Sequence, residues 1–304
     1  MTARRVLVLG ATGKQGGTLA RLLVARGKRV TGLVRNPTSP AARSLAAEGV
    51  ALATGDLEDA AQLGRAMAGH DACFAVTTRY QDGPDAERRQ AKAIAAAARA
   101  SGIAHVVLSS GASADRATGL AHLDGKAAIE AVLRDAGIPL TIVAPVSFME
   151  NVVTFPWLWA GLKRGELAYP LSPEQRHQYV CCADIAAFAA FVLAERAQFL
   201  GRRIDIASDA VTGPEAAQAL SAAAGRPVRY RSIPADEVRR DFPDLAPLYA
   251  WYSANPVRVD LAQLHRSYPA IGWRRFATWA AEQDWRALGA AADDPPTVQA
   301  MVRI

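Results

Sequence analysis

Three glycines near the start of the chain are spaced as in a phosphate-binding turn. Gly10, Gly13 and Gly16 follow an apolar run over residues 6–9 and lead into a helical pattern. A helix N-terminus presents unpaired N–H groups and a partial positive charge, and glycines let phosphates approach the backbone. The G-x-x-G-x-x-G spacing alone is equally compatible with simple packing. Its place between a strand and a helix predicts a diphosphate site.

An arginine, Arg35, follows the next expected strand, over residues 29–34. In nucleotide-binding βαβ units an acidic residue here bonds the ribose hydroxyls of NAD, whereas an arginine accommodates the 2′-phosphate of NADP. A guanidinium–phosphate contact contributes about 1.5–3 kcal/mol, which is enough for a tenfold preference. The alternative is that Arg35 is only a solvated strand end. The arginine therefore predicts NADP(H) as the cofactor.

Two further residues with useful chemistry stand four positions apart on an expected helix, over residues 120–136. His122 and Lys126 project from the same face of that helix. Because an imidazole titrates near neutral pH, His122 is a candidate proton donor. Ser109 and Ser110 are candidates to hydrogen-bond a substrate oxygen. The alternative is that the histidine packs and the serines satisfy nearby backbone groups.

Alternating strands and helices must position these residues. Carboxyl ends of parallel strands meet at one edge of the sheet, where ligands of such folds bind. The pattern predicts an α/β fold: a Rossmann-type, doubly wound parallel sheet with a smaller C-terminal lobe. We expect a dinucleotide-binding domain over 1–150, late sheet strands interleaved with the small lobe over 151–290, and a tail over 291–304. The expected strands cover residues 6–9, 29–34, 50–54, 71–76, 105–109, 139–144 and 202–207.

Some residues near the strand ends have a structural reading as well as a functional one, and others have a structural reading alone. Asp56 follows the third strand, where it either meets the adenine amino group or caps the helix over 60–67. Asp184 follows an apolar run and is expected to be a structural N-cap. The aromatic residues Phe148, Phe155, Trp157 and Trp159 either roof a pocket beside the nicotinamide or pack in the core of the small lobe.

Composition excludes several other functions. The chain has 304 residues, 51% of them hydrophobic, and a mild net charge of +6 that is scattered along it. A nucleic-acid surface is therefore not expected. The apolar run over 185–194 is too short to span a bilayer. The chain has three cysteines, Cys73, Cys181 and Cys182, and they lack the spacing of metal ligands, so we expect no metal site. We also expect buried, reduced thiols and a cytoplasmic protein.

Five segments together resemble one known family. They are Gly-Ala-Thr-Gly-Lys-Gln-Gly at 10–16, Val-Arg-Asn-Pro at 34–37, Gly-Asp-Leu at 55–57, His-Leu-Asp-Gly-Lys at 122–126 and Ser-Phe-Met-Glu-Asn at 147–151. In this order, over residues 4–285, they resemble the NmrA-like group of atypical, extended short-chain dehydrogenase/reductases. The resemblance implies a Rossmann domain that binds NADP(H), with a small lobe over the nicotinamide end. The implied cofactor contacts are Gly10, Ala11, Thr12, Gly13, Lys14, Gln15, Arg35, Asp56, Leu57, Thr77, Thr78, Arg79, Lys126, Phe148 and Asn151.

The resemblance leaves two functions open. Ordinary members of the superfamily carry Tyr-x-x-x-Lys, in which the tyrosine protonates the substrate and the lysine binds ribose. Here Lys126 is kept, and His122 stands in place of the tyrosine. One hypothesis is an NADPH-dependent reductase of a small unsaturated, quinone-, imine- or carbonyl-type substrate, with Lys126 and His122 in the catalytic site. The other is a non-catalytic NADP(H) sensor that acts through a protein partner. Either function is compatible with a homodimer.

Overall fold

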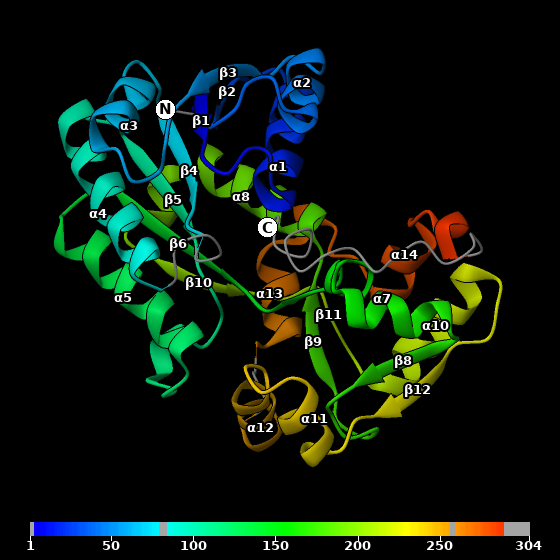
Figure 1. Cartoon of the computed structure of the whole chain (residues 1–304). Coiled ribbons are helices and arrows are strands. Elements are labelled where there is room, and N and C mark those ends of the chain that lie inside the picture. The colour runs from blue at the N-terminus through cyan, green and yellow to red at the C-terminus, as the bar shows by residue number, and fades with distance from the viewer. Residues whose placement is uncertain (1–2, 79–83, 256–258, 289–304) are drawn as a thin grey trace. The chain divides into compact units, whose positions relative to one another are not determined.

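The structure is a computed structural model that describes residues 3–78, 84–255 and 259–288 (Figure 1). The prediction for Arg79 and that for the tail over 291–304 lie outside the described residues. The chain divides into two compact units. The first comprises the described residues of Met1–Pro145 together with Ile185–Ile206. The second comprises Val146–Asp184 and the described residues from Ala207 onward.

A seven-stranded sheet organises the first unit, and its neighbouring strands pair in parallel. The strand order is β10-β6-β5-β4-β1-β2-β3, so the direction of winding reverses between β1 and β4. In doubly wound sheets, ligands bind at the carboxyl edge beside such a reversal. The predicted fold class is therefore confirmed. The strands are β1 (Arg5–Val8), β2 (Arg29–Val34), β3 (Ala51–Thr54), β4 (Ala72–Val76), β5 (His105–Ser109), β6 (Leu140–Pro145) and β10 (Arg203–Ile206).

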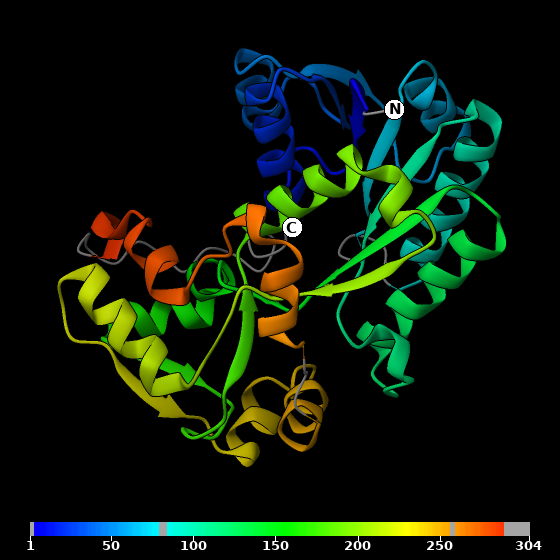
Figure 2. The same ribbon diagram turned by 180° about the vertical axis from the view of Figure 1, so that it is seen from behind.

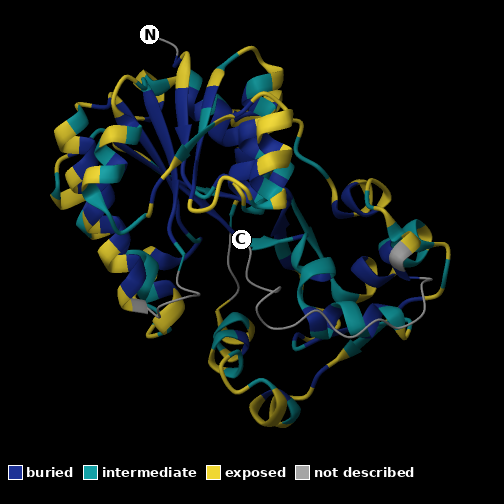
Figure 3. Ribbon diagram, turned by 45° about the horizontal axis from the view of Figure 1, so that its top comes forward, coloured by how far each residue is buried: buried dark blue, intermediate teal, exposed yellow. Residues whose placement is uncertain are grey.

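Helices cover both faces of this sheet. Helices α3, α4 and α5 lie side by side on one face (Figure 1), and α1 and the later part of α8 cover the other (Figure 2). The strands between these layers are mostly buried, whereas the outer faces of the helices are exposed (Figure 3). The strands are therefore continuous apolar runs because helices bury both faces of the sheet. The helices are α1 (Lys14–Ala25), α2 (Pro40–Ala47), α3 (Ala60–Met67), α4 (Pro84–Ser101), the 3₁₀ turn η1 (Ala114–Arg116), α5 (Ala121–Asp135), α8 (Cys182–Ala194) and α9 (Arg196–Phe199).

The second unit is built on two small sheets. One has the order β11-β9-β7, and the other pairs β12 with β8 in parallel. Helix α10 packs on β12 and α14, and its N-terminus carries a capping box formed by Thr212 and Glu215. The strands are β7 (Ser147–Phe148), β8 (Glu166–Tyr169), β9 (His177–Val180), β11 (Asp209–Val211) and β12 (Arg229–Ser232). The helices are α6 (Asn151–Thr154), α7 (Pro156–Lys163), α10 (Gly213–Ala224), α11 (Ala235–Asp241), α12 (Ala246–Ala254), α13 (Leu261–Ser267), η2 (Pro269–Ile271), α14 (Phe276–Ala281) and η3 (Trp285–Leu288).

Asp184 is structural, but the prediction that it is an N-cap is wrong. Helix α8 begins at Cys182, so the aspartate lies in its first turn. The fully buried carboxylate accepts hydrogen bonds from Ser208 Oγ at 2.6 Å and from the backbone N and Nη1 of Arg274, both at 2.7 Å. Its role is to join segments far apart in the chain, because a buried carboxylate requires paired donors.

Membrane-spanning helices and metal clusters are both missing from the described residues. In that part of the chain, no helix is long and apolar enough to cross a membrane. The same residues contain no cluster of three or more His, Cys, Asp or Glu side chains able to hold a metal ion.

Candidate nucleotide site

The glycine turn connects β1 to α1 at the carboxyl edge of the sheet. Gly10 has φ +66°, a left-handed conformation that glycine adopts without strain. The N–H of Gly13 donates to the carbonyl of Gly10 at 2.9 Å, and Gly13 is the N-cap of α1. A Cβ on Gly16 would lie 2.3 Å from the Gly10 oxygen. Gly10 therefore suits the backbone conformation of the turn, Gly16 leaves no room for a side chain, and a helix N-terminus follows.

The side chains of this turn differ in exposure. Thr12 is exposed and Lys14 is half-buried, whereas Ala11 and Gln15 are buried. Gln15 Oε1 accepts a hydrogen bond from Ser109 Oγ at 2.7 Å. The glutamine thus ties α1 to the end of β5, and the segment over 12–14 is exposed at Thr12 and half-buried at the next two residues. A phosphate would meet backbone N–H groups there.

Arg35 lies directly after β2, the strand next to β1. It is exposed, and it precedes a turn in which Asn36 Oδ1 accepts hydrogen bonds from the N and Oγ1 of Thr38 at 2.9 and 2.7 Å. The turn leads into α2, whose N-cap is Ser39. The geometry places a guanidinium at the end of the strand adjacent to the glycine turn, as the sequence predicts.

The residues after β3 correct one structural reading. Asp59, not Asp56, caps α3, since its Oδ1 accepts from the N–H groups of Ala61 and Gln62. These bonds, with that from Gln62 the strongest, lower the pKa of Asp59. Asp56 is exposed, and its Oδ1 accepts from the N–H of Glu58 at 2.8 Å. The adenine contact of Asp56 and Leu57 stays a prediction.

A buried polar cluster occupies the end of β4. Lys126 Nζ lies 2.6 Å from Glu87 Oε1 and 3.3 Å from Thr77 Oγ1, and that hydroxyl donates to Glu87 Oε1 at 2.9 Å. Beside them, Gln90 bonds both the N–H and the carbonyl of Thr78. The sequence indicated the lysine and the threonines but not Glu87 or Gln90, because a helical periodicity does not show which strand end a helix side chain reaches.

The predicted catalytic residues have unequal surroundings. His122 is exposed in the first turn of α5, and Lys126 lies one turn later with its side chain 12% exposed. Ser110 Oγ donates to Glu130 Oε1 at 2.5 Å, just as Ser109 donates to Gln15. A hydroxyl has one hydrogen, so neither serine can donate to a substrate in this arrangement. The hydrogen-bond partners of both serines are side chains and not the nearby backbone groups of the alternative, and a bond from either serine to a substrate oxygen stays a prediction.

The remaining predicted residues belong to the second unit. Phe148 ends β7 and Asn151 begins α6, and both are half-buried. Trp157 stacks on Phe155 with ring centroids 6.4 Å apart and lies 5.2 Å from the ring of Phe242. These aromatic side chains pack against the core of the second unit. Their contribution to a pocket beside the nicotinamide stays a prediction.

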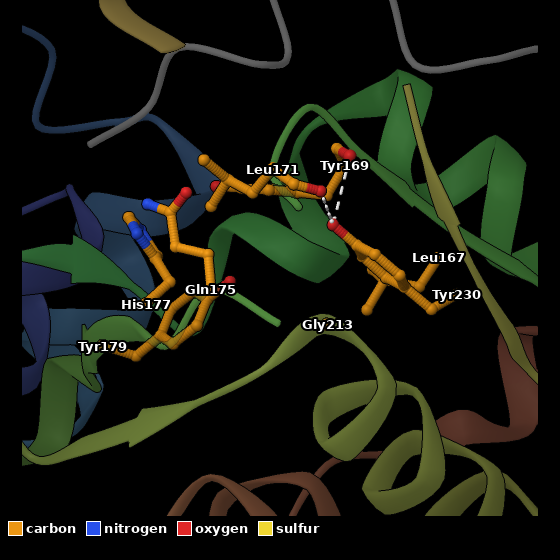
Figure 4. A pocket seen from close by; sticks show the side chains of 8 residues that line it. All are labelled: Leu167, Tyr169, Leu171, Gln175, His177, Tyr179, Gly213 and Tyr230. Atoms are coloured by element: carbon orange, nitrogen blue, oxygen red, sulfur yellow. Dashed lines mark hydrogen bonds between the residues drawn. The ribbon is translucent and has the colours of Figure 1, made fainter. Parts of the chain in front are cut away.

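A small hollow lies within the second unit, with Tyr169, His177 and Tyr230 on its wall (Figure 4). Tyr230 Oη donates to the carbonyl of Leu171 at 2.6 Å, and His177 Nε2 lies 2.8 Å from Ser147 Oγ. Burial lowers the pKa of His177 to about 4 and raises that of Tyr230 to about 12. Both side chains are therefore neutral near pH 7. The lining residues are Leu167, Tyr169, Leu171, Gln175, His177, Tyr179, Gly213 and Tyr230.

Comparisons with known proteins agree with the predicted family. A family model described as the NmrA-like family matches residues 2–254. An NAD(P)H azoreductase from Xenophilus azovorans is 33% identical over 237 residues, which cover 77% of this chain and 79% of that protein. A (4-alkanoyl-5-oxo-2,5-dihydrofuran-3-yl)methyl phosphate reductase from Streptomyces griseus subsp. griseus is 33% identical over 242 residues, with the same coverage.

The fold is also similar to a solved structure. An NADPH-dependent quinone oxidoreductase from Escherichia coli, in complex with NADPH, has a TM-score of 0.74 and 24% sequence identity, covering 91% of this chain and 98% of that one. At this identity the likeness shows the fold alone. The match to the family model spans most of the chain and so shows the family as well as the fold. The chain belongs to the NmrA-like family.

Proposed function

We propose that this protein is an NADPH-dependent reductase of a small unsaturated, quinone-, imine- or carbonyl-type substrate. The observation that carries the proposal is that three adjacent strands end in complementary groups. The glycine turn follows β1, Arg35 follows β2, and Thr77 with its partner Lys126 follows β4. Carboxyl ends of neighbouring parallel strands share one edge, so these groups suit a single extended, phosphorylated ligand.

Each residue has a role that follows from its chemistry. The N–H groups of the turn bind the diphosphate, Arg35 binds the 2′-phosphate and Lys126 binds ribose hydroxyls. Asp56 contacts the adenine, and the segment over 148–151 contacts the nicotinamide end. Bound NADPH supplies a hydride. An exposed imidazole such as His122 supplies the proton that completes a two-electron reduction.

The relatives favour the reductase over the sensor. Both curated relatives described above are reductases by name, and each aligns with more than three quarters of this chain. We further propose that residues 1–150 bind the nucleotide and residues 151–290 bind the substrate. A homodimer or a protein partner is open to test.

We also propose that the protein is cytoplasmic. The cysteines Cys73, Cys181 and Cys182 are buried and outside any disulfide, and burial raises the pKa of the Cys73 and Cys181 thiols.

The test is a substrate screen. NADPH oxidation is followed with azo dyes, quinones, enones, imines and aldehydes, each against a blank without protein. We expect turnover with at least one class. Tight NADPH binding without turnover across the panel would favour the sensor, and a wild-type protein that fails to bind NADPH would refute both.

A further inference from the structure

The Lys126 ammonium is held by two partners on different elements. Glu87 comes from the first turns of α4, and Thr77 follows β4. The Glu87 side chain is 4% exposed, and that of Lys126 is 12% exposed. A buried carboxylate is stable only when it is paired and hydrogen-bonded, and here one oxygen receives both the ammonium and the Thr77 hydroxyl.

A count of hydrogens shows what is left for a ligand. The single hydroxyl hydrogen of Thr77 goes to Glu87, so this oxygen can only accept from Lys126. An ammonium has three hydrogens, and two of them are used by these partners. The third has no partner among the described residues. The two contacts fix the direction of the third N–H, and the partly exposed lysine can offer it to an acceptor.

We propose that Glu87 is a positioning residue for the cofactor: it orients Lys126 so that the remaining N–H meets a hydroxyl of the nicotinamide ribose. The inference rests on the proposed NADPH site and deepens it. Glu87 also neutralises the ammonium. The lysine therefore acts in this protein as a directed hydrogen-bond donor more than as a positive charge that balances a phosphate. This role agrees with His122, because this protein has no tyrosine at that position whose ionisation a positive lysine would favour.

A purely structural role for the pair makes a different prediction. If the pair only joined α4 to α5, its loss would lower stability and weaken the binding of every ligand of the first unit alike. If Glu87 acts through Lys126 on the nicotinamide ribose, the loss affects only ligands that contain this ribose. The fragment 2′,5′-ADP carries the adenosine and its 2′-phosphate but lacks the nicotinamide riboside, so it separates the two roles.

The experiment measures the affinity of the full chain for NADPH and for 2′,5′-ADP by calorimetry. In Glu87→Gln we expect NADPH to bind about tenfold more weakly, the effect of a misdirected hydrogen bond from a charged donor. The affinity for 2′,5′-ADP should stay within about twofold. The control is Glu48→Gln, which breaks the surface pair of Glu48 with Arg21 and should change neither affinity. If Glu87→Gln does not fold, Glu87→Asp replaces it, because aspartate keeps the carboxylate charge on a shorter side chain. We expect the same result: weaker binding of NADPH and unchanged binding of 2′,5′-ADP.

A double-variant cycle shows whether the effect passes through the lysine. In a Lys126→Met background, Glu87→Gln should change NADPH affinity by less than about twofold, because no ammonium remains to be oriented. Equal losses for both ligands, no loss for NADPH, or a full loss in the Lys126→Met background would each overturn the proposal. Failure of the proposed reductase is distinguishable, because it is a lack of turnover while these affinities remain measurable.

Discussion

At the scale of single residues, Arg35 has the most specific expected effect. Arg35→Ala should remove most of the preference for NADPH and leave the affinity for NADH nearly unchanged, since only NADPH carries the 2′-phosphate. The loss for NADPH should be about tenfold or more. Calorimetry with both nucleotides checks this. Wild-type protein that binds the two equally well would remove Arg35 from cofactor selection.

His105 gives a prediction about stability and pH. Thr141 Oγ1 donates to the carbonyl of Phe199, so His105 Nε2 must donate to Thr141, and the buried Nδ1 is left without a partner. Burial, with a smaller contribution from Arg196, lowers the pKa of His105 to about 4. Between pH 6.5 and pH 4 the imidazole of His105 is protonated in the unfolded chain but neutral in the folded chain. Its contribution to the free energy of unfolding is therefore fully present above pH 6.5 and is lost as the pH falls towards 4, by up to about 3 kcal/mol.

His105→Gln is the matching variant. Its free energy of unfolding in urea, measured at pH 7 and pH 5, should fall less on acidification than that of the wild-type protein. His177 in the second unit has a similarly lowered pKa and should keep part of the pH dependence in both proteins. Identical pH dependence in the two proteins would contradict the assignment.

Residue types at strand ends could be predicted from sequence, but their partners could not. Gly10, Arg35 and Thr77 are recognisable because each follows an apolar run that predicts a strand. Glu87 lies 39 residues from Lys126, and its side chain reaches the lysine only because α4 and α5 pack together. At the start of α3 the sequence points to Asp56 as the possible cap, whereas Asp59 is the residue that caps the helix.

At the scale of elements, the glycine turn depends on Gly16. Gly16→Ala places a methyl group 2.3 Å from the Gly10 oxygen, so the turn must open or α1 must shift. We expect a loss of nucleotide affinity of at least about tenfold and a lower melting temperature. Gly64→Ala is the control, because a Cβ added there would have no atom within 4 Å and alanine favours the helix by about 0.5–1 kcal/mol. If Gly16→Ala binds NADPH normally, the turn is not the phosphate site.

The elements of the first unit could be predicted nearly throughout. The expected strand over 105–109 and the expected helix over 60–67 have the bounds of β5 and α3. The expected strand over 29–34 likewise has the bounds of β2, and most other boundaries shift by a residue or a few, since helix ends are set by caps and not by periodicity alone. The N-terminus of α8 was misplaced for this reason. Its first residues, Cys182 and Ala183, continue the apolar run of β9, so the sequence contains no visible break between strand and helix.

At the scale of the whole molecule, the division of labour between Lys126 and His122 distinguishes enzyme from sensor. Lys126→Ala should weaken NADPH binding and turnover together. His122→Ala should lower turnover by about 10²–10⁴-fold and spare NADPH affinity, since a general acid acts in the chemical step. Steady-state rates combined with calorimetry check both variants. Turnover that survives His122→Ala unchanged would remove this residue from the mechanism.

The fold class and the family could be predicted because their signals are local. Each βα unit carries its own strand, turn and helix pattern, and parallel pairing follows from the alternation. The second unit could not be derived in this way. Its sheets join β7 to β9 and β8 to β12 across many intervening residues, and its strands are only two to four residues long. Strands this short carry little periodicity, so the sequence pattern does not show which of them pair.

The most direct test of the central claim is a comparison of kcat/KM for NADPH and NADH, with the best substrate from the screen as the electron acceptor. The account predicts measurable turnover and a preference for NADPH of about tenfold or more, because Arg35 contacts the 2′-phosphate. Equal values for the two nucleotides, or no oxidation of either above the blank across the substrate panel, would contradict it.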